Sequence, residues 1–295
     1  MTGGHLEPHE HYYVPKSSYW PILGSIGLFT LLVGLIHILH ANPYGWYIFL
    51  AGALIIAYMM FGWFSAVIRE SRQGLYSNQL DNSFRLGMVW FIFSEIMFFG
   101  GFFGVLFYVR ELVVPWLGGI GAKVSTHELL WDQFQAAWPL LKNPDPTKFT
   151  APKEAMGAWG IPALNTLILL SSGATVTWAH LALKQNHRIQ LALGLFATIA
   201  LGATFLGFQI YEYYHAYTEL GLKLNSGIYG TTFFMLTGFH GAHVTIGTLM
   251  LIVIFLRCLN GHFTPEKHFA FEATAWYWHF VDVIWLLLFT LVYWL

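Results

Sequence analysis

The chain has 295 residues, of which 56% are hydrophobic, 18% aromatic and only 10% charged. This composition is typical of a polytopic membrane protein, and a formal net charge of -1 gives no indication of a nucleic-acid partner or an acidic substrate. The single cysteine, Cys258, excludes an internal disulfide and any metal site built from several cysteines of this chain alone.

Residues 1–18 form a polar amino-terminal tail. They lack the basic region, apolar core and small-residue cleavage site of a secretory signal peptide. The histidines and glutamates of the tail could bind a metal ion, but their composition favours a solvated segment without chemistry.

Seven apolar segments follow, each long enough for a helix that crosses a bilayer. They are residues 19–39, 46–68, 84–114, 158–183, 191–217, 227–256 and 270–295. The sequence therefore predicts an all-α membrane protein with seven transmembrane helices.

Two connections between these segments are long. The polar residues 69–83 form an inner loop, so the sequence permits a two-helix unit (residues 19–68) next to a five-helix bundle (residues 84–295). The outer loop, residues 115–157, contains five prolines. Within it, residues 129–141 (LLWDQFQAAWPLL) are a candidate for a short interfacial helix.

The basic residues of the short loops predict the orientation in the membrane. Those on the amino-terminal side are Arg69, Arg72, Arg85, Lys184, Arg188, Arg257 and Lys267, whereas the opposite short loops contain only Lys223. The positive-inside rule therefore places the amino terminus in the cytoplasm or matrix, and an odd number of crossings places the carboxyl terminus on the outer side.

Two carboxylates lie deep within apolar segments. Counting helical rise from Arg85 places Glu95 about 15 Å deep, near the centre of a hydrocarbon core about 30 Å thick. Acids at that depth are usually protonated or paired and often functional. On the sixth segment His243 comes closest to the level of Glu95 and is its expected partner, and a purely structural neutral carboxyl is the alternative. Asp282 is also deep and shares a helix face with His279.

The fourteen histidines suggest a dinuclear metal site as another hypothesis. Glu212 and His215 form one E-x-x-H motif, and His240 and His243 are three residues apart. A carboxylate-bridged di-iron site needs two such motifs at one level, whereas Glu212 and His215 fall near the outer interface and no second motif occurs within a helix. A dinuclear site is therefore disfavoured, although spacing alone does not exclude haem ligation by His240 or His243.

Four stretches of the sequence carry recognisable motifs. They are R-x-G-M-x-x-F-x-x-S-E-x-M-F-F at residues 85–99, TVTWAHLAL at 175–183, YGTTFFMLTGFHGAHVTIGT at 229–248 and FAFEATAWYWHFVDVIWLLLF at 269–289. In order and spacing they resemble the later helices of subunit III of the haem–copper cytochrome c oxidases. With the first helix pair present, the resemblance covers nearly the whole chain.

The resemblance implies a V-shaped cleft between the two-helix unit and the five-helix bundle, occupied by phospholipids. It implies a non-redox core subunit with no catalytic, cofactor or metal residue of its own, because the haem and copper belong to partner subunits. The implied partners are oxidase subunit I in direct contact, subunit II, small subunits and phospholipids, with cytochrome c reached only through the complex. That complex oxidises cytochrome c and reduces dioxygen to water while it pumps protons. This chain would stabilise the catalytic subunit and support proton uptake.

The same resemblance implies particular site residues. Arginines that match Arg69 and Arg257 lie at the lipid cleft in that family, so both are expected to bind phospholipid headgroups, with Trp63 and Phe99 as acyl-chain neighbours. Positive-inside anchoring is the alternative for both arginines. Glu95 matches the carboxyl that hydrophobic carbodiimides modify, so we expect it to be protonated near neutral pH and to serve structure and lipid packing more than obligatory proton transfer.

The length of the outer loop indicates a location. Residues 115–157 exceed the matching loop of mitochondrial relatives, which favours a bacterial plasma membrane over the mitochondrial inner membrane. Three alternative functions stay open: a stand-alone proton-coupled transporter that uses Glu95, a His-rich membrane metalloenzyme, and a subunit III-like protein of a quinol oxidase or nitric oxide reductase. The sequence shows no obvious inverted repeat that would support the transporter.

Overall fold

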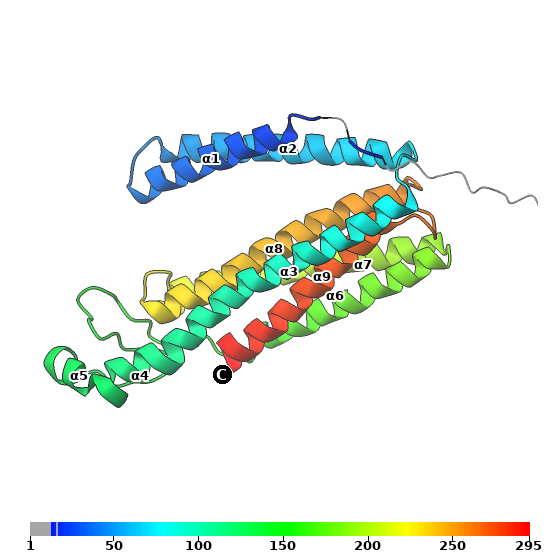
Figure 1. Cartoon of the computed structure of the whole chain (residues 1–295). Helices are drawn as coiled ribbons and strands as arrows, with labels where there is room; N and C mark the ends of the chain where they lie inside the picture. The colour runs from blue at the N-terminus through cyan, green and yellow to red at the C-terminus, as the bar shows by residue number, and fades with distance from the viewer. Residues whose placement is uncertain (1–12, 16) are drawn as a thin grey trace, which may run out of the picture. The chain divides into compact units, whose positions relative to one another are not determined.

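The structure is a computed structural model that describes residues 13–15 and 17–295, so the polar tail predicted over residues 1–18 lies largely outside the described residues. Within the described residues, seven helices are long and apolar enough to cross a membrane, which confirms the all-α prediction (Figure 1). The spanning helices are α1 (Trp20–Leu39), α2 (Gly45–Arg72), α3 (Asn78–Tyr108), α6 (Ile161–Lys184), α7 (Arg188–His215), α8 (Ile228–Leu259) and α9 (Phe269–Leu288). Contacts divide the chain into two compact units, residues 1–86 and 87–295.

In the first unit, α1 and α2 pack as an antiparallel pair because glycines let their backbones approach. A Cβ atom at Gly34 would collide with the backbone of Phe49, and one at Gly52 would collide with the backbone of Leu31. Close contact through small residues is a common way for membrane helices to associate, since lipid provides no hydrophobic force between them.

Gly52→Leu is therefore expected to separate the two helices, with a loss of stability at or above the roughly 1–3 kcal/mol typical of overpacking, because a backbone cannot move aside as a side chain can. Ala51→Leu is the matched control, since Ala51 is exposed on the same helix. The thermal unfolding midpoint of the two variants in detergent checks this prediction. Equal unfolding midpoints for both variants would show that the close approach of α1 and α2 does not stabilise the protein.

The inner connection is shorter than the polar residues 69–83 suggested. The chain is non-helical only over residues 73–77, because α2 and α3 both continue through polar residues that are compatible with a helix. The Tyr76 hydroxyl donates a hydrogen bond to Glu70 Oε2 at 3.0 Å, and Arg85 pairs with Asp81 at 3.1 Å across one turn of α3.

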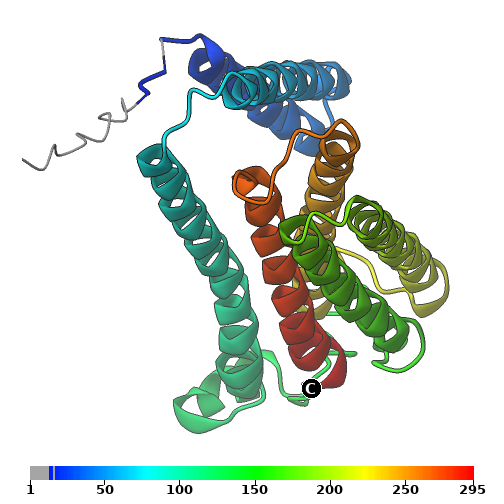
Figure 2. The ribbon, with the colours of Figure 1, turned by 90° about the vertical axis from the view of Figure 1, so that its right-hand side faces the viewer.

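In the second unit, α9 is the most buried spanning helix, and it packs against α6, α7 and α8 (Figure 2). Trp278 of α9 fits against Gly202 of α7 and Gly247 of α8, where a Cβ would approach the indole within 2.7 Å and 2.9 Å respectively. Its indole N–H donates to the Ser172 hydroxyl of α6 at 2.9 Å. One tryptophan thus joins four helices.

The part of α3 in the second unit contacts α8 and α9 through aromatic side chains. The Phe98 ring meets the Phe239 ring edge-on at 5.1 Å, and Phe99 lies 6.2 Å from Phe280. Long side chains therefore bridge α3 to the bundle. A short π-helical segment, Val109–Val113, and α4 (Val114–Leu117) extend this helix at its outer end.

The outer loop contains a short helix, but not where the sequence placed it. The helix α5 spans Val124–Leu130, and no helix occurs over residues 131–160, so the candidate at 129–141 was wrong. Pro139 lacks the amide hydrogen that a helix interior needs, and this helps to explain why a helix does not form there. The loop is instead fastened to the segment before α8, where the Asn143 amide donates to the Ser226 carbonyl at 3.1 Å.

One partly buried carboxylate in this loop forms a local turn. Thr147 donates to Asp145 Oδ1 from its hydroxyl at 2.6 Å and from its backbone amide at 3.0 Å. These hydrogen bonds, helped by nearby Lys148, hold the pKa of Asp145 below its ordinary value. Ionised Asp145 therefore stabilises the folded turn at pH values above the ordinary pKa of an aspartate. This stabilisation is lost as the pH falls through the lowered pKa.

Candidate functional site

Glu95 of α3 and His243 of α8 meet inside the second unit. Glu95 Oε2 lies 2.9 Å from His243 Nε2, and their side chains are 21% and 14% exposed. Helical rise predicted that the two residues lie at the same depth, and in the structure their side chains are in direct contact. Both belong to helices that cross the membrane.

The second ring nitrogen of His243 determines how this contact is made. His243 Nδ1 lies 2.7 Å from the Phe239 carbonyl oxygen, which can only accept, so Nδ1 must carry a hydrogen. A neutral His243 then has an unprotonated Nε2, and the hydrogen in the contact comes from a protonated Glu95. The only other arrangement with a hydrogen bond is an imidazolium paired with a carboxylate, which contains the same number of protons.

The aromatic surroundings favour the neutral arrangement. The Phe99 ring lies 4.9 Å from the His243 ring, and the Tyr277 ring stacks at 6.4 Å. In apolar surroundings a separated pair of charges is costly unless further hydrogen bonds support it. In the neutral arrangement, the carboxyl hydrogen of Glu95 is donated to His243 Nε2. A neutral His243 cannot donate to Glu95 here, because Nδ1 already holds the single ring hydrogen.

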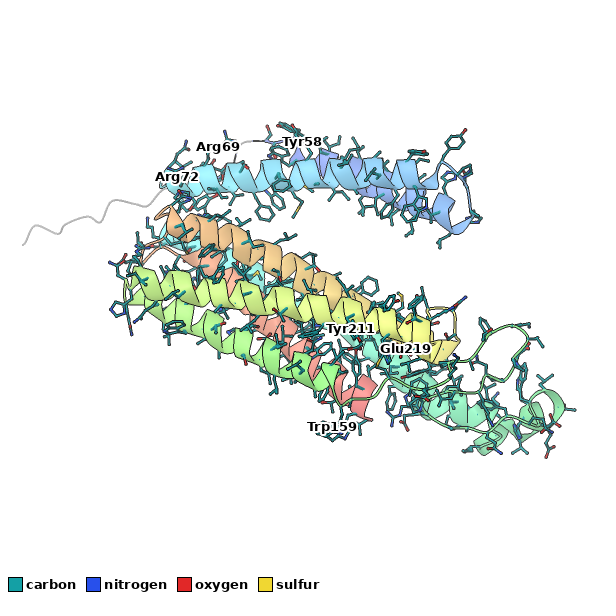
Figure 3. The ribbon with its side chains drawn as sticks, turned by 180° about the vertical axis from the view of Figure 1, so that it is seen from behind. Tyr58, Arg69, Arg72, Trp159, Tyr211 and Glu219 are labelled. Carbon is teal, nitrogen blue, oxygen red and sulfur yellow. The ribbon has the colours of Figure 1, made fainter. Side chains whose placement is uncertain are left out.

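The expected lipid-binding residues fall in both units. In the first unit, Arg69 and Trp63 are exposed on α2, and Figure 3 shows Arg69 with Arg72 at the end of that helix. In the second unit, Arg257 is only 9% exposed, and its guanidinium lies 4.4 Å from the centroid of the Phe263 ring. Phe99 is buried among protein side chains, which leaves no surface for an acyl chain there, so the expected lipid contact of Phe99 is not retained.

A second arginine supports the loop beside Arg257. Both terminal nitrogens of Arg188 donate to the Phe263 carbonyl oxygen at 3.0 Å. Arg188 begins α7 and Arg257 lies in the last turn of α8, so two cationic side chains converge on one loop residue, Phe263. This arrangement gives the second unit a fixed basic region where α7 begins and α8 ends.

The residues of the disfavoured metal hypothesis do not converge. Glu212 Oε1 accepts a hydrogen bond from the Tyr293 hydroxyl at 2.5 Å, whereas His215 pairs with Glu219 at 3.2 Å. Across the described residues, no group of three or more histidine, cysteine, aspartate or glutamate side chains could hold a metal ion. Counting placed Glu212 at the outer interface, but its side chain is buried in the bundle because Tyr293 of the last helical segment covers it.

Two groups at the Glu95 site were not anticipated. The Phe239 carbonyl accepts a hydrogen bond from His243 Nδ1 and so determines which ring nitrogen carries the hydrogen. The sequence could have predicted this contact, because side chains in helices often bond to the carbonyl four residues earlier. Tyr277 stacks on His243, and only the packing of α9 against α8 could place it there.

The fold and the site define a class: a polytopic helical membrane protein with a carboxyl–imidazole pair within its spanning helices. The family model for cytochrome c oxidase subunit III matches residues 9–129 and 146–295. The chain is 41% identical over 293 residues to cytochrome c oxidase subunit 3 of Arabidopsis thaliana, covering 98% of each chain. It is 39% identical over 298 residues to the probable subunit 3 of Rickettsia felis, covering 99% of this chain and 96% of that one. For the subunit of the seal Halichoerus grypus the identity is 39% over 284 residues, or 96% of each chain.

The chain belongs to the cytochrome c oxidase subunit III family.

Proposed function

We propose that this chain is the non-redox core subunit III of a respiratory cytochrome c oxidase, and that it stabilises the catalytic subunit, binds structural phospholipid and supports proton uptake. The observation that carries the proposal is similarity to oxidase subunits 3 along nearly the whole chain, at about 40% identity. Electron transfer and oxygen reduction belong to the haem- and copper-bearing partners, subunits I and II. Cytochrome c is met only through the complex.

In this proposal the Glu95–His243 pair is structural. A protonated carboxyl that donates to a neutral imidazole satisfies both groups without a net charge. The pair links α3 to α8 within the hydrocarbon, where few other polar contacts are available to hold a helix. Proton uptake is supported indirectly, because a durable bundle keeps the neighbouring catalytic subunit in its active state.

We further propose that the polar residues 69–83 join a two-helix unit (residues 19–68) to a five-helix bundle (residues 84–295), and that the chain binds structural phospholipid. Arg69, Trp63 and Arg257 are the proposed lipid contacts. The two arginines lie at the ends of their helices, where an anionic headgroup can pair with guanidinium.

Arg257→Ala and Arg69→Ala are expected to reduce the number of phospholipids retained per complex, because each removes one charged contact to a headgroup. Arg72→Ala is the matched control, since Arg72 is a second exposed arginine in the last turn of α2. Native mass spectrometry of the purified complexes counts the lipids. Wild-type lipid counts in both variants would contradict the assignment and leave positive-inside anchoring as their role.

The proposed location is a bacterial plasma membrane, with the amino terminus in the cytoplasm and the carboxyl terminus in the periplasm. The basic residues of the inner loops support this orientation. Residues 130–145 fall outside the family match, in line with an outer loop longer than the family pattern. A mitochondrial inner membrane is the less favoured location, and the similar proteins come from a bacterium, a plant and a mammal.

Purification of the tagged chain in mild detergent tests the proposed function. We expect haem-bearing subunits to co-elute with it, with haem absorbance in the optical spectrum and phospholipid in the mass spectrum. Elution of the chain alone from cells that express a complete oxidase would refute the proposal.

A further inference from the structure

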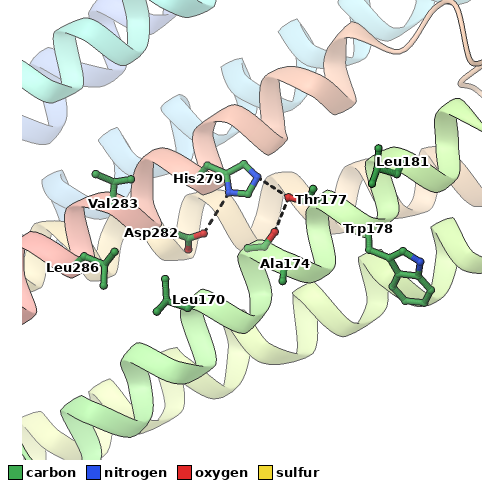
Figure 4. Close-up of a pocket in the computed structure, with 10 residues that line it drawn as sticks. Leu170, Ala174, Thr177, Trp178, Leu181, His279, Asp282, Val283 and Leu286 are labelled. Atoms are coloured by element: carbon green, nitrogen blue, oxygen red, sulfur yellow. Dashed lines mark hydrogen bonds and ion pairs between the residues drawn. The ribbon is translucent and has the colours of Figure 1, made fainter.

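Two hollows in the second unit differ in charge. The wider one lies between α6 and α9, where the His279 imidazole reaches the Thr177 hydroxyl at 3.1 Å (Figure 4). Among the described residues, no lysine or arginine lines it. The smaller one is a cavity of about 340 Å³ where α7 begins and α8 ends, and Arg188 lines it.

The smaller cavity has a cationic side and an apolar side. Its lining residues are Arg188, Leu191, Ala192, Cys258, Leu259 and Gly261. None of these described residues is acidic, so no carboxylate of the lining neutralises the charge of Arg188. A ligand with an anionic group and an apolar part matches both sides.

The Arg188 guanidinium is held in place before any ligand binds. Both of its terminal nitrogens donate to the Phe263 carbonyl oxygen at 3.0 Å, and Phe263 itself is only 2% exposed. A guanidinium has further N–H groups beyond those that one carbonyl oxygen can accept, and these can donate to a ligand. Because the long side chain is already ordered, a ligand binds without the entropy cost of ordering it.

The place of the cavity along the spanning helices indicates the anion. Arg188 begins one spanning helix and Leu259 ends the next, so the cavity lies at helix ends, where a bilayer has its headgroups. Phosphate is the anion that phospholipids place at that level, and a planar guanidinium pairs with two phosphate oxygens at once. The Arg257 guanidinium, 4.4 Å from the centroid of the Phe263 ring, adds a second positive charge beside the same loop residue.

We propose that this cavity binds a phosphate group through Arg188. The phosphate belongs either to a phospholipid, whose acyl chain then runs along Ala192 and Leu259, or to free phosphate, since the guanidinium recognises both in the same way. The site is separate from the lipid contacts proposed above. This inference rests on the proposed function only for the complex in which it is tested.

Photocrosslinking in the intact complex identifies the occupant. Leu259 lines the cavity and is 59% exposed, so p-benzoylphenylalanine in its place reports on a molecule bound there. We expect an adduct whose mass contains phosphorus. In Arg188→Gln its yield should fall about tenfold, as for the loss of a charge-assisted hydrogen bond. Lys184→Gln is the matched control, because Lys184 is exposed in the last turn of α6 and does not line the cavity.

A second variant leaves Arg188 and its contact with Phe263 untouched. Ala192→Phe fills the apolar side of the cavity, so it should lower the phospholipid adduct while the complex stays monodisperse. Ala200→Phe is its control, because Ala200 is exposed on α7 about two helical turns further along. A lipid adduct of unchanged yield in Arg188→Gln or in Ala192→Phe would overturn the proposal, and so would an adduct with a fatty acid, which contains no phosphorus.

Radiolabelled inorganic phosphate tests the other source. If no lipid adduct forms, the delipidated complex should bind inorganic phosphate at one site per chain, and Arg188→Gln should abolish this binding. The absence of both a phosphorus-containing adduct and Arg188-dependent phosphate binding would overturn the proposal. A tagged chain that purifies without haem-bearing subunits would instead refute the proposed function, and both measurements can still be made on it.

Discussion

Trp278→Ala is expected to lower the free energy of unfolding by about 3–5 kcal/mol, the range for removal of a large buried aromatic side chain. Trp278 is fully buried against Gly202 and Gly247 and donates to the Ser172 hydroxyl. Alanine would leave a cavity where three helices meet α9, and it would leave Ser172 without this donor.

Trp159→Ala is the matched control, because Trp159, which precedes α6, is 75% exposed and each variant removes one tryptophan. Surface substitutions of this kind usually change stability by less than about 0.5 kcal/mol. The midpoint of denaturant-induced unfolding in detergent, followed by tryptophan fluorescence, compares the two variants. Equal unfolding midpoints for the two variants would contradict the expected contribution of Trp278 to stability.

The second large effect concerns Glu95, for which alanine and glutamine should differ. Glutamine presents an amide N–H that can donate to His243 Nε2 in place of the carboxyl hydrogen, so Glu95→Gln should assemble and retain turnover and proton pumping. Alanine leaves His243 Nε2 without its donor. For Glu95→Ala we therefore expect a loss of about 1–3 kcal/mol in stability and a lower yield of complex.

Labelling by a hydrophobic carbodiimide provides an independent readout for the same residue. Such reagents need a protonated acid within reach of lipid, so labelling of the wild type should disappear in Glu95→Gln. Glu219→Gln is the control, because Glu219 is an exposed carboxylate paired with His215 and should not affect labelling. If a fully assembled, lipid-replete Glu95→Gln complex failed to pump protons, Glu95 would be an obligatory proton carrier instead.

Much of this architecture follows from regular helical geometry. Seven apolar stretches predicted the seven spanning helices because only a helix satisfies its own backbone in lipid. The constant rise per residue was also enough to bring Glu95 and His243 to one level, and the structure joins them by a hydrogen bond.

The sequence did not show which side chains face the interior of the bundle and which face its surface. Residue counting gives depth along a helix but not the direction that a side chain faces in the bundle. Glu212 is therefore buried under Tyr293 although its depth suggested an interface, and Phe99 lies in the core although the resemblance suggested lipid. The outer loop was difficult for a different reason: its helix depends on contacts such as His127 Nδ1 with the Leu117 carbonyl at 2.9 Å, which join residues ten apart.

Selective removal of this chain from the purified complex tests most directly whether it is a non-redox subunit. Optical spectra and dioxygen consumption are measured for the stripped complex and for the released chain. We predict that all haem absorbance stays with the stripped complex, which still reduces dioxygen at first, and that the released chain is colourless. Stoichiometric haem in the released chain, or immediate loss of haem absorbance and oxygen reduction from the stripped complex, would contradict the account.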